Sequence, residues 1–180
     1  MINDHDSPAF TKTYLKPRDF NVILSRNSRR SIFFIDMELT PIGQVRSPIK
    51  STPKPEYDWQ GVISEIVVVP GLTPGLAKLD ESSHIIVIYW AHQATNCADM
   101  ALAVRYRGDP ALPMVGVFAS RSLHRPNPLG QKVAKILGIQ GNVIKVEGLD
   151  ALDGTPVLDI KPFIPRYDAP DDATATQWQG

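Results

Sequence analysis

Long apolar runs and cysteines are what this 180-residue chain most clearly lacks. No stretch approaches the roughly 18 consecutive apolar residues that span a membrane. The N-terminus also has no secretory apolar region behind a basic start. The single cysteine, Cys97, excludes an internal disulfide framework and fits a reducing compartment. These absences predict a cytoplasmic protein that has no membrane partner.

A net charge of one sign is also absent, because Lys+Arg and Asp+Glu both number 19. No overall positive field indicates a nucleic-acid partner, although a local basic patch can still bind one. Neither glycine-rich phosphate-binding pattern, GxGxxG or GxxxxGK[ST], occurs in the chain. No long amphipathic helix separates the apolar runs, which disfavours a βαβ nucleotide-binding fold.

The chain does contain short, β-branched apolar runs that are separated by Gly, Pro, Asn and Asp. The runs predicted to be strands are 42–46, 61–69, 84–90, 114–118, 133–139, 143–149 and 157–160. Thr73 to Leu79 is predicted to be a short helix. Short strands with little helix predict a mainly all-β fold, namely a small β-barrel with short helical connections.

Three regions are expected along the chain. The barrel domain spans 39–168, after an irregular N-terminal extension, 1–38, and before a flexible tail, 169–180. The extension contains scattered basic residues and no sustained hydrophobic period. We interpret it as flexible or loosely docked rather than as a nucleic-acid-binding arm, because nothing aromatic is interleaved with the Arg29–Arg30 pair to stack on bases.

Polar side chains concentrate in residues 116–130, GVFASRSLHRPNPLG. Pro126 and Pro128 fix their own φ angles and push the preceding residues towards extended geometry, so this loop is stiff. It presents two guanidinium groups, Arg121 and Arg125, which suits an anionic or planar polar ligand.

Two other polar stretches follow predicted strands. His92 and Gln93 come directly after the most apolar run, and Asp150 to Asp153 lie at a predicted hairpin. Together with the 116–130 loop, they predict a small-molecule pocket at one rim of the barrel. For the two aspartates, ordinary turn chemistry in Asp153–Gly154 is an almost equal alternative.

Metal and hydrolase sites are less well supported. The candidate metal ligands His84, His92, Cys97 and His124 match no zinc spacing. Ser120 and Ser122 lie near His124 in sequence, but no GxSxG nucleophile elbow is present. We predict no metal, and the sequence identifies no catalytic residue or general base.

The 116–130 stretch resembles the signature of the TsaA-like, or TrmO, family, usually GVFATRSPxRPNPIG. The resemblance continues in the same order through IGQVRSP at 42–48, SHIIVIYWAHQ at 83–93 and GLDALDGTPVLDIKPFIP at 148–165. Four separate blocks make it specific, and they cover about 39–168.

The resemblance implies a homodimeric β-barrel methyltransferase that uses S-adenosyl-L-methionine and acts on tRNA. Its implied substrate is the exocyclic amine of threonylcarbamoyl-adenosine next to the anticodon. The residues implied to bind the cofactor are His92, Gln93, Arg121, Asp150, Ala151, Leu152 and Asp153, with Gln60 as a weaker match to an early contact of the family. The residues expected to meet RNA are Arg125, Asn127, Lys132 and Lys135.

The chain departs from the family signature at Ser120, Leu123 and Leu129, where threonine, proline and isoleucine are usual. Longer bacterial members also carry a C-terminal domain, so the way in which tRNA docks is open. Two alternatives remain at this point: a non-catalytic module that binds S-adenosylmethionine or RNA, and methyl transfer to another substrate.

Overall fold

The computed structural model describes residues 38–54, 57–94 and 102–176 of the chain. The chain divides into two units, Met1–Leu39 and Thr40–Gly180. The predicted N-terminal extension, 1–38, lies outside the described residues apart from Glu38. Within the described ranges, no helix is long and apolar enough to cross a membrane.

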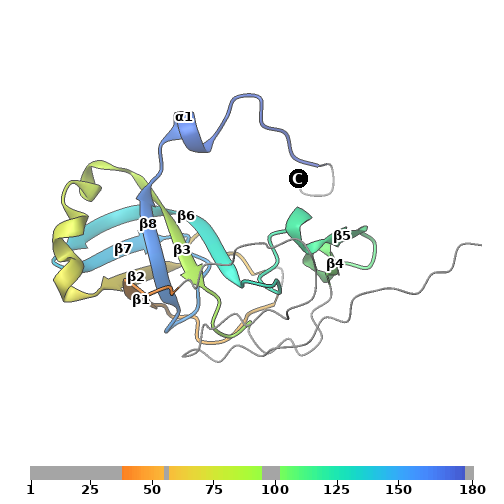
Figure 1. Ribbon diagram of the computed structural model, residues 1–180, viewed down its shortest axis with the longest axis horizontal. Coiled ribbons are helices and arrows are strands. Elements are labelled where there is room, and N and C mark those ends of the chain that lie inside the picture. Colours follow the sequence, from red (N-terminus) through yellow and green to blue (C-terminus); the bar gives the residue numbers. More distant parts are fainter. Residues whose placement is uncertain (1–37, 55–56, 95–101, 177–180) are drawn as a thin grey trace, which may run out of the picture. The chain divides into compact units, whose positions relative to one another are not determined.

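Six strands of the second unit close into an antiparallel barrel, so the predicted mainly all-β barrel is confirmed (Figure 1). Around the barrel they follow the order β1-β2-β7-β6-β3-β8. Their bounds are β1 Gly43–Arg46, β2 Ile63–Val68, β3 His84–Trp90, β6 Leu129–Gln140, β7 Val143–Glu147 and β8 Pro156–Pro162. Two further strands, β4 Ala103–Arg105 and β5 Met114–Gly116, pair with each other in a separate small sheet.

The helical connections are short. They are the 3₁₀ helices η1 Pro70–Leu76, η2 Leu79–Glu81, η3 Tyr106–Gly108 and η4 Val117–Ala119, and the one-turn α-helix α1 Pro165–Asp168. The helix predicted at Thr73 to Leu79 is therefore corrected to two 3₁₀ helices. Pro74 lies inside η1 and has no N–H to donate to an α-helical hydrogen bond, which favours the tighter form.

Two strand boundaries around the 116–130 loop differ from the prediction. β5 ends at Gly116 rather than at Phe118, because the Val117 carbonyl accepts hydrogen bonds from Ser120 and Arg125 instead of from a neighbouring strand. β6 begins at Leu129 rather than at Val133. Pro128 has no N–H, yet its carbonyl still accepts from the Ala91 N–H at 2.8 Å, so pairing starts immediately after the last proline.

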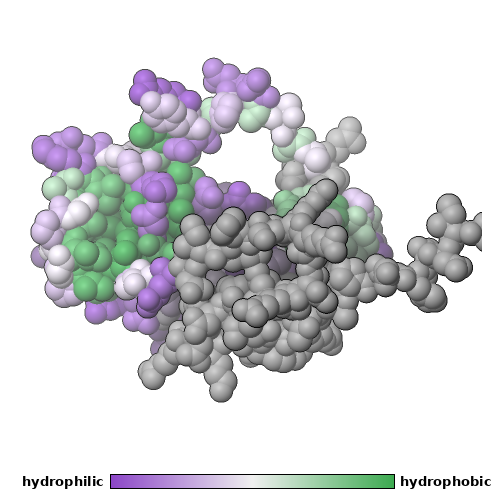
Figure 2. Space-filling model, in the orientation of Figure 1, coloured by the Kyte–Doolittle hydropathy of each residue, from purple (hydrophilic) through white to green (hydrophobic). Residues whose placement is uncertain are grey.

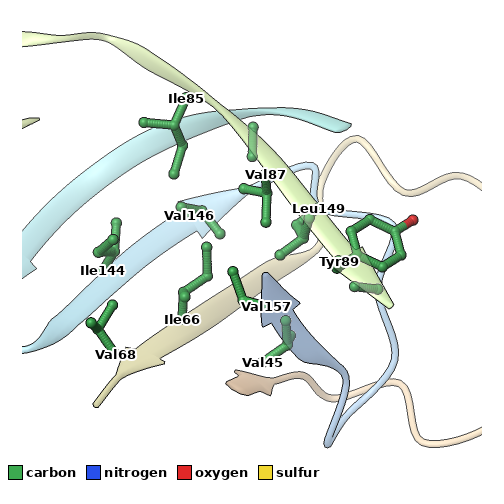
Figure 3. Packing of buried hydrophobic residues seen from close by; sticks show 12 residues of the cluster. Val45, Ile66, Val68, Ile85, Val87, Tyr89, Ile144, Val146, Leu149 and Val157 are labelled. Carbon is green, nitrogen blue, oxygen red and sulfur yellow. The ribbon is translucent and has the colours of Figure 1, made fainter. Parts of the chain in front are cut away.

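Apolar side chains that alternate along the strands fill the barrel. In β3, Ile85, Val87 and Tyr89 point inwards with exposed fractions of 3% or less (Figure 3). They pack against inward-facing residues of the other strands, including Ile66 of β2 and Ile144 of β7. The nearly continuous apolar run of β3 fits its burial, because Ile86, on the outward face, is also only 7% exposed.

The two mouths of the barrel differ in polarity. Adjacent strands are antiparallel, so one mouth collects the end of β3 and the starts of β6 and β8. At the other mouth, η1 and η2 cover a mostly apolar hollow of about 560 Å³. The apolar side chains that line it are Ile42, Val68, Leu72, Leu76, Leu79 and Ile160. Apolar surface gathers over this part of the barrel, whereas the stretch around α1 is mostly hydrophilic (Figure 2).

The core predicts the cost of truncating one inward-facing isoleucine. Ile144→Ala should lower the free energy of unfolding by about 2–5 kcal/mol, because it leaves a cavity in the closed barrel. Ile63→Ala is the matched control, since Ile63 is 47% exposed, and it should cost less than about 1 kcal/mol. Urea denaturation of the two variants measures the difference, and equal losses would contradict the assigned core.

Candidate functional site

A cleft of about 120 Å³ lies at the polar mouth of the barrel. Its walls come from the end of β3, the 116–130 loop and the turn between β7 and β8. Its lining residues are Thr52, Tyr89, Ala91, His92, Gln93, Ala94, Leu123, His124, Asp150, Ala151, Leu152 and Thr155. The three polar stretches predicted to meet at one rim therefore each contribute residues to one cleft.

Strand pairing explains why these stretches meet. Trp90 at the end of β3 pairs with Leu129 at the start of β6, so the residues after β3 face the end of the 116–130 loop. Tyr89 also pairs with Val157, near the start of β8. The turn that precedes β8 is thereby held beside the same two segments.

The buried Tyr89 and the partly exposed Asp150 form a polar contact in the wall of the cleft. The Tyr89 hydroxyl donates to the Asp150 carboxylate at 2.9 Å and lies 3.1 Å from the Asp150 carbonyl oxygen. Tyr89 is only 3% exposed. Burial, together with the neighbouring carboxylate, raises the pKa of Tyr89 above its usual value, so the hydroxyl stays protonated and acts as a donor.

Two cations lie close to this pair. The Lys132 ammonium is 3.7 Å from the second Asp150 oxygen. The Arg121 guanidinium donates to the Gln131 carbonyl at 2.8 Å, and its charge acts to lower the pKa of Tyr89. The Asp150 carboxylate therefore has a donor on one oxygen and a cation near the other, and it still lines the cleft as an acceptor.

The absence of a side chain at Gly130 leaves room for the Tyr89 ring. The two residues are direct partners across β6 and β3. A Cβ atom on Gly130 would overlap Cζ and Cε2 of the Tyr89 ring, so the ring occupies the space that a side chain at this position would fill. The last glycine of the 116–130 stretch thus allows the tyrosine to reach Asp150.

His92 and Gln93 are held by different partners. The His92 Nδ1 atom lies 3.3 Å from the hydroxyl of the buried Thr155. The Gln93 side-chain amide donates to the Lys50 carbonyl at 3.1 Å, which leaves its oxygen available as an acceptor. Both residues were predicted from the sequence, and both line the cleft with Ala151 and Leu152.

Asp153 is placed differently from Asp150. Its carboxylate accepts from the Ser47 N–H at 3.0 Å, and its own N–H donates to the Ile49 carbonyl at 2.7 Å. Asp153 therefore ties the segment after β1 to the turn before β8. It is not among the residues that line the cleft, and neither are Gln60 and Arg121.

Arg125 organises its own loop. Its guanidinium donates to three carbonyls, those of Val117, Ser120 and Ser122, at 2.8–2.9 Å. These bonds, rather than the prolines alone, hold the 116–130 loop in shape. Asn127 and Lys135 are exposed, whereas Lys132 points towards Asp150.

Seven of the twelve lining residues were not among the predicted site residues, namely Thr52, Tyr89, Ala91, Ala94, Leu123, His124 and Thr155. Tyr89 carried a usable signal, because a tyrosine inside an otherwise apolar buried strand needs a partner for its hydroxyl. Leu123, where the family signature has proline, contributes an apolar wall. In the described part of the chain, no three metal-ligating side chains lie together, and Cys97 falls outside it.

The chain is similar in sequence and in structure to known proteins. Residues 45–169 match the family model of the tRNA-methyltransferase O N-terminal domain. A crystal structure of TrmO from Pseudomonas aeruginosa superposes with a TM-score of 0.62 at 31% identity, over 77% of this chain and 60% of that one.

Sequence relatives include proteins of very different lengths. An S-adenosyl-L-methionine-binding protein of Archaeoglobus fulgidus is 41% identical over 135 residues, which cover 73% of this chain and 93% of that protein. A longer protein of the same archaeon is 40% identical over 74% of this chain, which spans only 36% of its length. A mouse tRNA (adenine(37)-N6)-methyltransferase is 40% identical over 95 residues, 53% of this chain and 22% of that protein.

The packing of Tyr89 over Gly130 predicts a position-specific effect. Gly130→Ala should lower the free energy of unfolding by about 1–3 kcal/mol, because the added methyl group displaces a buried ring. Gly138→Ala, in the same strand, meets nothing within 4 Å and should leave stability unchanged or slightly raised. Urea denaturation compares the two, and a neutral Gly130→Ala would refute the packing described for Tyr89.

Proposed function

Because the chain belongs to the tRNA-methyltransferase O N-terminal-domain family, we propose that it is a tRNA methyltransferase that uses S-adenosyl-L-methionine. The observation that carries the proposal is that every residue lining the cleft falls within the matched range, 45–169. The proposed substrate is the exocyclic amine of threonylcarbamoyl-adenosine next to the anticodon. The mouse relative, a tRNA (adenine(37)-N6)-methyltransferase, supports this choice.

The residues of the cleft suit S-adenosylmethionine in chemical type. Asp150 offers a carboxylate to hydroxyl or amino groups, and Gln93 offers an amide oxygen. Leu123, Ala151 and Leu152 provide apolar surface against which a purine can pack. The volume of about 120 Å³ is smaller than the roughly 300–1,000 Å³ of pockets that enclose a whole ligand. The cleft therefore accommodates part of the cofactor.

S-adenosylmethionine supplies a methyl group already activated by a sulfonium centre. The protein then needs to position the acceptor amine and exclude water rather than provide a nucleophile. Tyr89 and Lys132 fix the orientation of Asp150, so that its carboxylate presents an acceptor to the cleft in a defined position. The Arg125 bonds keep the loop that carries Leu123 and His124 against the same opening.

The proposal keeps the remaining site residues that the resemblance implies. Arg121 positions β6 by donating to the Gln131 carbonyl, and Asp153 positions the segment after β1 by accepting from the Ser47 N–H. The Gln60 carbonyl lies beside Gly148, just before the turn that contains Asp150. A homodimer and a cytoplasmic location are part of the proposal and rest on the family resemblance. The exposed Phe118 side chain, at 81%, is apolar surface that a second copy would cover.

A second candidate is a module that binds S-adenosylmethionine without transferring its methyl group. The Archaeoglobus relative named for such binding is matched over 93% of its length, whereas the TrmO structure is matched over 60%. The matched region therefore makes up almost the whole of a protein that is named for binding.

Methyl transfer distinguishes the two candidates. The protein is incubated with radiolabelled S-adenosylmethionine and a tRNA that carries threonylcarbamoyl-adenosine, with the unmodified transcript as control. We expect label in the modified tRNA only. Label in both RNAs would indicate a different target base. Cofactor binding by calorimetry without transfer to either RNA would favour the second candidate.

The role of Asp150 is tested by cofactor affinity. Asp150→Asn keeps an acceptor for Tyr89 but removes the charge, and it should weaken S-adenosylmethionine binding about tenfold to a hundredfold, since a hydrogen bond to a charged group contributes about 1.5–3 kcal/mol. Asp159→Asn is the matched control, because Asp159 pairs with Lys161 and lines the hollow at the opposite mouth. Calorimetry measures both, and an unchanged affinity in Asp150→Asn would exclude a cofactor contact there.

A further inference from the structure

Two of the four residues expected to meet RNA are engaged within the protein. The Arg125 guanidinium bonds three carbonyls of its own loop, and the Lys132 ammonium lies 3.7 Å from Asp150. Breaking these bonds to bind phosphate would disturb the cleft itself. An RNA substrate therefore needs other cations close to the cleft.

A second hollow, of about 610 Å³, lies at the same mouth of the barrel. It is formed where β1 ends and β2 begins, with β7 and the turn before β8 as its other sides. Its lining residues are Arg46, Ser47, Lys50, Ile63, Ser64, Glu65, Lys145 and Asp153. We call it the Arg46–Lys145 groove.

Strand register places two of its cations in one row. Arg46 of β1 pairs with Glu65 of β2, and Glu65 pairs in turn with Lys145 of β7. Neighbouring strands lie about 4.8 Å apart, so the row runs directly across the outside of the barrel. Glu65 spaces the two cations and lies 3.7 Å from the Arg46 guanidinium.

The cations of the groove outnumber the carboxylates that face them. Asp153 is occupied by the Ser47 N–H, and Glu65 can neutralise one charge. Among the described residues, Lys50 and Lys145 have no carboxylate within ion-pair distance. The Arg46 side chain is 66% exposed, so a solvated ligand can reach its guanidinium.

The groove adjoins the cleft through two shared segments. The Lys50 carbonyl accepts the Gln93 side-chain amide, and Gln93 lines the cleft. Asp153 belongs to the same turn as Asp150, which lines the cleft on its other side. An RNA that brings its target base to the opening of the cleft would therefore have its neighbouring phosphates close to this groove.

We propose that the Arg46–Lys145 groove binds backbone phosphates of the RNA substrate beside the target base, with Arg46, Lys50 and Lys145 as the phosphate-binding cations. This inference rests on the proposed function, because it takes tRNA as the substrate. The groove accounts for RNA binding by a chain whose net charge is zero, because the cations are concentrated at the edge of the site.

The test compares two triple variants that remove the same charge. The first is Arg46→Gln/Lys50→Gln/Lys145→Gln. The control is Lys78→Gln/Lys161→Gln/Arg166→Gln, whose residues lie between η1 and η2, in β8 and in α1, outside both the groove and the cleft. Affinity for a tRNA transcript and its isolated anticodon stem–loop is measured by fluorescence anisotropy from 50 to 300 mM salt.

We expect the groove variant to bind RNA about tenfold to a hundredfold more weakly at physiological salt, because three phosphate contacts and the counterion release that accompanies them are lost. The slope of log affinity against log salt should flatten by about 2, or about 0.7 for each cation removed. The control should keep the wild-type slope. S-adenosylmethionine affinity should be unchanged in both variants.

Two results would overturn the proposal: wild-type RNA affinity in the groove variant, or an equal weakening in both variants, which would show an effect of net charge alone. Failure of the proposed function is recognised separately. If the wild-type protein binds RNA through the groove but transfers no methyl group to it, the RNA-binding groove is supported and the proposed methyltransferase activity is rejected.

Discussion

The hydrogen bond between the buried Tyr89 hydroxyl and Asp150 is the interaction on which the site depends. It joins an apolar strand of the core to the polar turn before β8, and it requires Gly130 beneath the tyrosine ring. A hydroxyl buried without a partner would cost stability, so the core and the cleft constrain each other. The strand that fills the barrel therefore also fixes the orientation of the carboxylate at its mouth.

In the 116–130 loop, Arg125, which the sequence suggested as a ligand-binding residue, stabilises the loop itself. Arg125 directs its donors to three carbonyls of the loop, and Ser120 is buried while bonding the Val117 carbonyl. These bonds end β5 at Gly116. The loop then leads into β6, which pairs with β3. Leu123 and His124 are the residues of the loop that line the cleft. Both belong to the segment that the Arg125 hydrogen bonds hold in place.

Antiparallel closure gives the two barrel mouths different chemistry. The end of β3 and the starts of β6 and β8 bring carboxylate, amide and imidazole groups together, while η1 and η2 cover an apolar hollow at the other mouth. The groove beside the cleft follows from the same arrangement, since the end of β1 and the start of β2 lie at the polar mouth. The surfaces proposed for the cofactor and for RNA therefore lie side by side at one mouth of the barrel.

The sequence by itself determined the mainly all-β class, most strands, the family, and the cleft residues His92, Gln93, Asp150, Ala151 and Leu152, because alternation and short motifs are local properties. It could not assign partners to individual polar groups. Asp150 and Asp153 are three residues apart in one turn, yet one faces the cleft and the other bonds Ser47. Only the tertiary structure decided this, because cross-strand register determines which side chain meets which partner.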